Sequence, residues 1–252
     1  MPKILVIGAH PADPVDLAGG TIYHHRTYGH EVYLMTLTDG LYSHNPVGLE
    51  REDKRAEFKA AAKVLDVPSI NCYFEGLEDE PLVANTLVIR ELAVFIRNMT
   101  PDIVITHHPN EYAHWDHAEC GKIVCRALKA AIKLPTHFGV LHFVPSLYFF
   151  AVQFRPEVSR VGAVPQAPDI LVGLGNVEVG RKVQAMMCFA SQGHDDEEKM
   201  WQRMNSFESE MGRADGLRWS EGFILGQPLK VSLLPQNPNI GFYNKKDGKD
   251  GL

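Results

Sequence analysis

The stretch Ile4-Leu5-Val6-Ile7-Gly8-Ala9-His10-Pro11-Ala12-Asp13 places a short apolar run directly before a polar loop. A continuous apolar run bounded by turn residues is typical of a strand buried on both faces of a parallel sheet. In open α/β sheets, binding sites form at the carboxyl ends of such strands. We therefore expect this loop to deliver the imidazole of His10 and the carboxylate of Asp13 to a binding site.

A second cluster of the same kind is His114-Trp115-Asp116-His117, a few residues beyond the apolar run Ile103-Val104-Ile105-Thr106. One imidazole and one carboxylate from the first loop, with one imidazole from the second, make three nitrogen and oxygen ligands. Three such ligands, with a fourth position left open, are typical of a catalytic zinc ion. The two clusters together predict a metal enzyme.

The composition is that of an ordinary globular protein, with 252 residues, 45% hydrophobic and 22% charged, and a formal net charge of −6. It predicts a single domain over residues 1–252, with a flexible tail from about residue 240. The acidic balance argues against a nucleic-acid partner. No run approaches the ~20 apolar residues that span a membrane. The four cysteines lack metal-binding or redox spacing, as expected for reduced thiols. The first residues run straight into a predicted strand and leave no room for a signal peptide, so we expect a cytoplasmic protein.

Short β-branched runs alternate with helical patterns over the first two-thirds of the chain, which predicts βαβ units and a parallel sheet. The expected strands cover about residues 3–8, 31–38, 70–74, 103–106, 146–150, 169–172, 223–225 and 229–231. The expected helices cover about residues 19–28, 50–65, 85–97, 117–133, 179–190 and 197–210. A flavodoxin-like sheet without a metal is the main alternative.

The two motifs resemble those of a known family of enzymes. Residues Val6 to Thr21 combine an apolar strand, the pattern Ala-His-Pro-x-Asp and a following Gly-Gly-Thr, and His114 to His117 give His-x-Asp-His. This resembles the LmbE-like or PIG-L family of zinc-dependent deacetylases over roughly residues 1–130, and Ser191-Gln192 resembles the family's C-terminal region. The resemblance and the alternation together imply a three-layer α/β/α sandwich with a mostly parallel, Rossmann-like sheet.

The resemblance also implies a role for each polar residue of the two motifs. His10 and Asp13 match two zinc ligands of the family, and His117 matches the third. Asp116 matches the residue that orients His114, so that this imidazole can hold and deliver a proton.

Two further side chains are candidates for substrate binding. Arg55 is a candidate clamp for an anionic group of the substrate, with a solvated surface arginine as the alternative. His194 stands before a polar helix and is a candidate for either the site or the surface. We expect the substrate to be a small molecule and, by family resemblance, the protein to form a homo-oligomer.

Position 12 departs from the family pattern. The first motif of the family is usually Ala-His-Pro-Asp-Asp, in which the first aspartate is the general base, whereas this chain has Ala12. General-base catalysis is worth about 10²–10⁴-fold in rate, although zinc alone lowers the pKa of water to about 7. Three explanations compete. The alanine was introduced in place of the base to trap a substrate complex, another side chain of this chain acts as the base, or the protein catalyses a reaction other than deacetylation. The candidates for another base are Glu111, Asp39, His44 and His194.

Three functions fit these residues. The leading one is hydrolysis of an N-acyl group, in particular the N-acetyl group of an amino sugar or related metabolite, with His114 protonating the leaving amine. The second is hydration of an unsaturated oxo-dicarboxylic acid, since family members similar to 4-oxalomesaconate hydratase also lack the first aspartate. The third is metal or ligand binding without catalysis.

Overall fold

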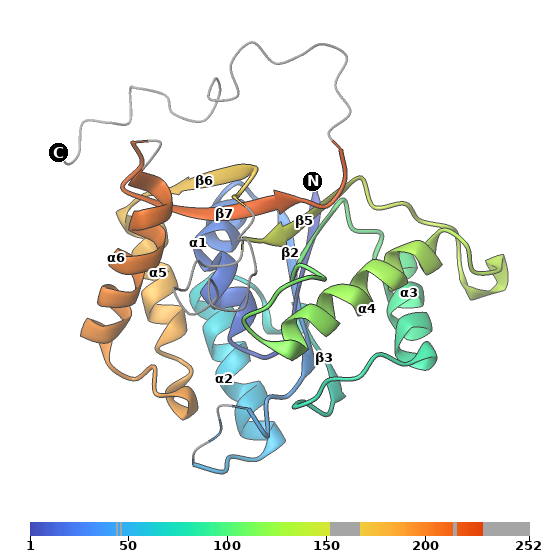
Figure 1. Ribbon diagram of the computed structural model, residues 1–252, viewed down its shortest axis with the longest axis horizontal. Coiled ribbons are helices and arrows are strands. Elements are labelled where there is room, and N and C mark those ends of the chain that lie inside the picture. Colours follow the sequence, from blue (N-terminus) through green and yellow to red (C-terminus); the bar gives the residue numbers. More distant parts are fainter. Residues whose placement is uncertain (44, 46, 152–166, 214–215, 229–252) are drawn as a thin grey trace, which may run out of the picture.

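The structure is a computed structural model that describes residues 1–43, 45, 47–151, 167–213 and 216–228. Its centre is a seven-stranded sheet with the order β3-β2-β1-β4-β5-β7-β6 (Figure 1). Strands β1 to β5 run parallel, and β7 runs antiparallel to both of its neighbours. The strands are β1 (Lys3–Gly8), β2 (Glu31–Thr38), β3 (Cys72–Leu77), β4 (Ile103–Thr106), β5 (Ser146–Phe150), β6 (Ile170–Leu174) and β7 (Trp219–Leu225). The expected, mostly parallel sheet is confirmed.

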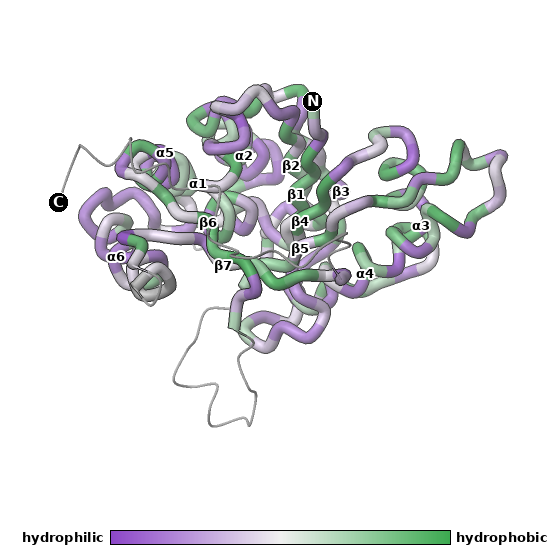
Figure 2. The backbone as a smooth tube through the Cα atoms, turned by 90° about the horizontal axis from the view of Figure 1, so that it is seen from above, coloured by the Kyte–Doolittle hydropathy of each residue, from purple (hydrophilic) through white to green (hydrophobic). Residues whose placement is uncertain are grey.

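Helices cover both faces of this sheet. Figure 2 shows α3 and α4 on one side of the strands and α1, α2, α5 and α6 on the other. The helices are α1 (Asp13–Thr27), α2 (Arg51–Val64), α3 (Thr86–Met99), α4 (Trp115–Ala131), α5 (Asn176–Met186) and α6 (Glu197–Arg213). The fold is therefore the expected three-layer α/β/α sandwich.

Strand β1 shows how the core is divided between the two faces. Ile4 and Val6 belong to the apolar cluster on the α1 and α2 side, whereas Leu5 and Ile7 belong to the cluster on the α3 and α4 side. This division follows from the period of two along a strand. Each of the four side chains is at most 1% exposed, and burying one such side chain contributes about 1.5–3 kcal/mol. A central strand therefore needs a continuous apolar run.

Helix α1 begins at Asp13, earlier than the expected start at Gly19. Pro14 stands in the first turn, where the missing N–H of proline costs no helical hydrogen bond. The two glycines lie inside the helix, and a Cβ at Gly20 would come within 2.5 Å of Leu174 Cδ1. Gly20 therefore lets α1 pack closely against β6, and Gly19 lies against Lys182 of α5.

The strand order reverses between β1 and β4. From β1 the chain moves outward through β2 and β3, and then returns to place β4 on the other side of β1, with Ile7 paired with Thr106. The carboxyl ends of β1 and β4 therefore lie side by side. In open α/β sheets, ligands bind at such a switch point.

The other expected elements differ mainly at their ends. The third strand begins at Cys72 instead of Ile70, and Asn85 caps α3 as expected by accepting the Val88 backbone N–H at 2.9 Å. The strand expected at 229–231 and the tail from about residue 240 lie outside the described residues. Among the helices that the structure describes, none has the length and apolar character needed to cross a membrane.

Candidate metal centre

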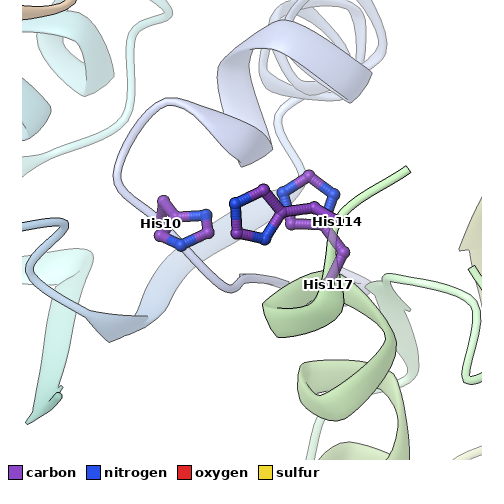
Figure 3. Close-up of side chains that lie close together, drawn as sticks. All are labelled: His10, His114 and His117. Atoms are coloured by element: carbon purple, nitrogen blue, oxygen red, sulfur yellow. The ribbon is translucent and has the colours of Figure 1, made fainter. Parts of the chain in front are cut away.

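The loops after β1 and β4 bring the side chains of both motifs into one cluster. Figure 3 shows His10, from the loop after β1, beside His114 and His117, from the start of α4. Asp13 Oδ2 lies 3.5 Å from His10 Nδ1, and Asp13 Oδ1 lies 3.4 Å from His117 Nε2. The three side chains predicted to bind zinc therefore converge, with Asp13 between the two histidines.

The first motif can fold in this way because β1 ends in glycine. A Cβ at Gly8 would come within 2.7 Å of Pro14 Cδ and 2.9 Å of Asp13 Cβ, so a side chain there would displace the first turn of α1. The backbone N–H of His10 donates to Asp13 Oδ2 at 2.7 Å and fixes the loop. The two predicted ligands are thus held relative to each other by the backbone.

The second motif is positioned by a close approach between α4 and the loop after β4. A Cβ at Gly121 would come within 2.5 Å of the carbonyl oxygen of His107. Because His117 lies one turn earlier on the same helix face, its ring stacks on that of His107, with the ring centroids 4.0 Å apart. The glycine in α4 therefore allows this stacking.

Each predicted histidine ligand has a carboxylate partner on its other ring nitrogen. His117 Nδ1 lies 2.6 Å from Glu111 Oε1, and His10 Nε2 lies 3.2 Å from Asp116 Oδ2. His117 Nε2 and His10 Nδ1 therefore remain to face Asp13. A carboxylate behind a histidine ligand is the usual arrangement in metal sites, where it fixes the tautomer and orients the ring.

His107 belongs to the same cluster, and the sequence analysis missed it. Its side chain is fully buried, with Nε2 3.0 Å from Asp13 Oδ2 and Nδ1 2.9 Å from Glu111 Oε2. Glu111 thus holds the rings of both His107 and His117. The signal was available in the sequence, because His107 directly follows the expected fourth strand.

Three groups of described side chains have ligand atoms within 4.8 Å of one another: His10-His114-His117, Asp13-His107-His117 and His10-Asp79-Asp116. Both nitrogens of His107 already face carboxylates. His114 Nδ1 accepts a backbone N–H at 3.2 Å, and its Nε2 lies 3.6 Å from Glu80 Oε1. Asp79 accepts the backbone N–H and the hydroxyl of Ser43. The donors that face one another without such a partner are His10 Nδ1, His117 Nε2 and Asp13 Oδ1. Two imidazoles and one carboxylate suit zinc and are also compatible with other first-row metals.

The carboxylates keep protons on the two histidines in the metal-free cluster. Burial opposes a charge on His10, but hydrogen bonds to Asp116 and Asp13 outweigh it and raise the pKa of His10 to about 9. Burial also opposes a charge on His117, but Asp13 and Glu111 raise its pKa to about 10. A cation is therefore favoured at this position, and metal binding releases protons.

The expected pairing of Asp116 with His114 is wrong. The Asp116 carboxylate contacts His10 and accepts the backbone N–H groups of Glu80 at 3.0 Å and Leu82 at 2.8 Å. Its link to His114 is instead its own backbone N–H, which donates to His114 Nδ1. The reason is that His114 is the N-cap of α4, so its ring turns toward the first free N–H groups of the helix.

Arg55 is partly buried and pairs with a carboxylate of this chain. Its Nε lies 2.7 Å and its Nη2 3.1 Å from the two carboxylate oxygens of Asp39. Arg51 Nη1 lies 2.9 Å from the same carboxylate, which is almost fully buried. Two guanidinium groups on one carboxylate leave a net positive charge beside the loop after β1, where Gly40 packs near Pro11.

A second residue missed by the sequence analysis is Lys54 of α2. It is fully buried, and its Nζ donates to Ser191 Oγ at 3.0 Å. Ser191 in turn donates to Glu57 Oε2 at 2.6 Å. Burial lowers the pKa of Lys54. These contacts attach the Ser191-Gln192 segment to α2.

Most of the side chains that were candidates to replace the missing base at position 12 already contact other side chains. Glu111 and Asp39 are held as described above, and His44 lies outside the described residues. His194 is half-buried near Asp16 of α1, where it helps Arg203 to lower the pKa of that carboxyl against the effect of burial. Ala12 itself is buried at the start of α1.

The sheet thus carries two histidines and an aspartate at its switch point, a set of donors suited to a metal ion. The profile of the PIG-L family, described as GlcNAc-PI de-N-acetylase, matches residues 5–128, which include both motifs. The resemblance to the PIG-L family is confirmed.

Two enzymes are similar in sequence. A 1D-myo-inositol 2-acetamido-2-deoxy-alpha-D-glucopyranoside deacetylase of Catenulispora acidiphila is 25% identical over 198 residues, 66% of this chain and 61% of that enzyme. The 4-oxalmesaconate hydratase of Pseudomonas putida is 28% identical over 207 residues, 75% of this chain and 74% of that enzyme. The match thus spans less than two thirds of the length of the deacetylase. The prediction of an enzyme is confirmed.

Two solved structures share the fold. The 4-carboxy-2-hydroxymuconate hydratase of Pseudomonas putida superposes with a TM-score of 0.76 at 22% identity, over 93% of this chain and 100% of that one. The N,N'-diacetylchitobiose deacetylase of Pyrococcus horikoshii superposes with a TM-score of 0.75 at 22% identity, over 88% of this chain and 83% of that one. The same fold therefore occurs in a hydratase and in a deacetylase.

Proposed function

We propose that this protein is a zinc-dependent hydratase that adds water across a carbon–carbon double bond of an unsaturated oxo-dicarboxylic acid. The observation that carries the proposal is Ala12, which is 7% exposed and stands where deacetylases of the family have their general base. The nearby carboxylates of Glu111 and Asp116 are bonded to the histidine ligands. Amide hydrolysis therefore lacks its usual base, whereas hydration needs only a group that moves one proton.

Zinc would be held by His10, Asp13 and His117, whose donor atoms fit it. When bound, zinc supplies a Lewis acid that polarises a substrate oxygen and acidifies water. The carboxylates behind the two histidines keep both rings oriented before the metal arrives.

His114 is the group proposed to move the proton. Its ring lies next to His10 and His117, with ring centroids 4.9 Å from each. In the proposed reaction its imidazole takes a proton from water as the water oxygen bonds to one carbon of the double bond. It then gives that proton to the neighbouring carbon, so the ring ends in its starting state.

The charge beside the site supports an anionic substrate. Arg51 and Arg55 share the single carboxylate of Asp39, and their side chains are 40% and 29% exposed. The excess positive charge can attract a carboxylate of the substrate. A dicarboxylic acid offers one carboxylate for this charge and leaves the other near the ligand cluster.

Removal of an N-acetyl group is the second candidate. It is favoured by the position of His114, which next to the ligands could protonate a leaving amine, and by the similarity to the deacetylase relative. Zinc-acidified water retains some reactivity at neutral pH without a carboxylate base. The substrate would then be an acetylated amino sugar or a related metabolite.

A two-part assay of the zinc-loaded protein distinguishes the two reactions. Unsaturated oxo-dicarboxylates are followed by loss of ultraviolet absorbance, and N-acetyl amino sugars by acetate release. We expect activity in the first assay, and acetate release alone would overturn the proposal.

Elemental analysis tests the metal independently of activity. We expect one zinc per chain after reconstitution, and none in a variant with His10→Ala, Asp13→Ala and His117→Ala. Full retention of zinc by that variant would contradict the ligand set. The homo-oligomer and the cytoplasmic location stay predictions, to be checked by light scattering and cell fractionation.

A further inference from the structure

A small cavity lies between α1, α6 and β7. Its volume is about 20 Å³, which gives room for one particle of the size of a water molecule. Its polar lining comes from Asp16 of α1, Glu208 of α6, and Ser220 and Glu221 of β7. The described residues that line it include none of the proposed metal ligands. The cavity is therefore a feature separate from the metal centre.

Two side chains of this lining carry a buried polar atom without a hydrogen-bond partner. In the part of the chain that the structure describes, no partner reaches Glu208 Oε2 or Ser220 Oγ. The two residues are only 4% and 1% exposed, so bulk water does not solvate these atoms. Because an unpaired buried polar atom is costly, the cavity calls for an occupant.

The three carboxylates around the cavity use all of their oxygens except one. Both oxygens of Asp16 accept hydrogen bonds from Arg203. Those of Glu221 accept from Lys182 and from two backbone N–H groups of α1. Glu208 Oε1 accepts from Lys182 at 2.7 Å. The remaining oxygen, Glu208 Oε2, is thus left over where three carboxylates share one ammonium and one guanidinium group.

The electrostatic surroundings of Glu208 favour a positive charge. Burial raises the pKa of Glu208, and the carboxylates of Asp16 and Glu221 raise it further, against the opposing effect of Lys182. The imidazole of His194 acts on Asp16. A cation or a proton beside Glu208 Oε2 therefore relieves the excess of negative charge.

Three occupants can be compared at this oxygen. A water molecule would pair with Glu208 and Ser220 but would leave the charge uncompensated. A proton on Glu208 would compensate the charge but would leave the cavity empty and Ser220 Oγ unpaired, since the two atoms do not reach each other. A monovalent cation does both, because it supplies the charge and binds carboxylate and hydroxyl oxygens.

We propose that this cavity binds one monovalent cation of the size of potassium, held by Glu208 Oε2 and Ser220 Oγ. Potassium is close to a water molecule in size, so it fits the cavity without a change in packing. The bound ion joins α6 and β7 to α1, beside Asp16 in the first turns of that helix. The site does not depend on which reaction the metal centre catalyses.

The first test compares the thermal unfolding of the full chain in potassium chloride and in choline chloride at equal ionic strength. Both salts screen charges equally, but choline is too large for the cavity. Potassium should raise the Tm by ~3–6 °C relative to choline once its concentration is about ten times the dissociation constant. Equal Tm values in the two salts at every concentration would overturn the proposal.

Variants of the lining show whether the effect comes from this cavity. Glu208→Gln keeps the shape of the side chain and removes its charge, so potassium and choline should give Tm values within ~1 °C of each other, even if both fall. Ser220→Ala should raise the half-maximal potassium concentration ~3–10-fold, the effect of losing one buried polar contact. Glu198→Gln, at an exposed glutamate of the same helix, should keep the full response. A full response in Glu208→Gln would contradict the site.

Crystals grown in rubidium chloride distinguish a cation from a proton or water. Rubidium substitutes for potassium and scatters anomalously, so a peak is expected between Glu208 and Ser220 in the wild type and none in Glu208→Gln. A wild-type cavity that is empty, or that holds a water molecule without an anomalous signal, would overturn the proposal whatever the enzyme assays show.

Discussion

His107 Nε2 lies 3.0 Å from Asp13 Oδ2, and this contact joins a side chain from the end of β4 to a predicted ligand from the end of β1. The adjacent strands thus hold the central carboxylate of the site from two sides: the backbone of the first loop and an imidazole of the second. Because both nitrogens of His107 face carboxylates, we expect it to support the proposed metal site without ligating the metal.

The first prediction concerns His107→Phe, which keeps an aromatic ring against His117 but removes both hydrogen bonds. The carboxylates of Asp13 and Glu111 then lose a buried partner, and the zinc dissociation constant should rise ~10–100-fold. Competition with a chromophoric chelator measures it. The control is His108→Gln, a neighbouring histidine whose ring packs on Phe149 outside the cluster; an unchanged affinity in His107→Phe would contradict the supporting role.

The second prediction concerns Ala12→Asp, which restores the aspartate of the usual family motif. If the protein is a hydratase, the new carboxylate has no proton to take, and it can ligate the metal or repel an anionic substrate. Hydratase activity should then fall or stay level, and acetate release should remain at background.

The same variant gives the opposite result for a deacetylase. Restoring the base should then raise amide hydrolysis ~10²-fold or more. Such a rise on any acetylated substrate would place deacetylation ahead of hydration. His114→Ala is the control, because it should impair either reaction.

The sequence predicted the elements whose signals are local. The buried run of β1, the Asn85 cap and the two motifs all depend on residues that are close together in the chain, so pattern and spacing were enough. The convergence of the two loops also followed, because the carboxyl ends of parallel strands meet at one edge.

The sequence could not predict contacts that depend on distant packing. Arg55 meets Asp39 only because α2 folds back beside the end of β2. The position of His107 after the fourth strand indicates that it lies near the site, but its stacking on His117 depends on how α4 packs. The pairing of Asp116 with His114 was implied by the family resemblance, which carries no information on where the side chain turns. Residues two apart near a helix start do not face each other, and the Asp116 carboxylate instead meets His10 from the loop after β1.

The third prediction concerns the buried charges that join α1, α5, α6 and β7. Lys182 Nζ lies 2.7 Å from Glu208 Oε1 and 2.8 Å from Glu221 Oε1, and Glu221 also accepts the backbone N–H groups of Gly20 and Thr21. Lys182→Met leaves two buried carboxylates without their cation and should lower the free energy of unfolding by about 3–5 kcal/mol. Chemical denaturation monitored by circular dichroism measures this.

An exposed ion pair provides the comparison for Lys182. Lys199 and Asp196 lie 3.5 Å apart, with side chains 68% and 43% exposed. Lys199→Met should change the unfolding free energy by less than about 1 kcal/mol, because water screens the pair. Similar small effects from both substitutions would show that the buried cluster contributes little net stability.

The last prediction concerns the pH dependence of stability, through His25 of α1. Burial, together with the neighbouring His30 and His24, lowers the pKa of His25 from 6.5 to about 4. Between these two values the unfolded chain binds a proton that the folded chain does not, so stability must fall as the pH drops from 6.5 to 4. His25→Gln removes this contribution, and the variant should lose about 3 kcal/mol less than the wild type between pH 7 and pH 4. Urea denaturation across this range measures the difference, with the exposed His137→Gln as the control. Parallel pH profiles for the wild type and His25→Gln would show that His25 takes up its proton without cost in the folded protein.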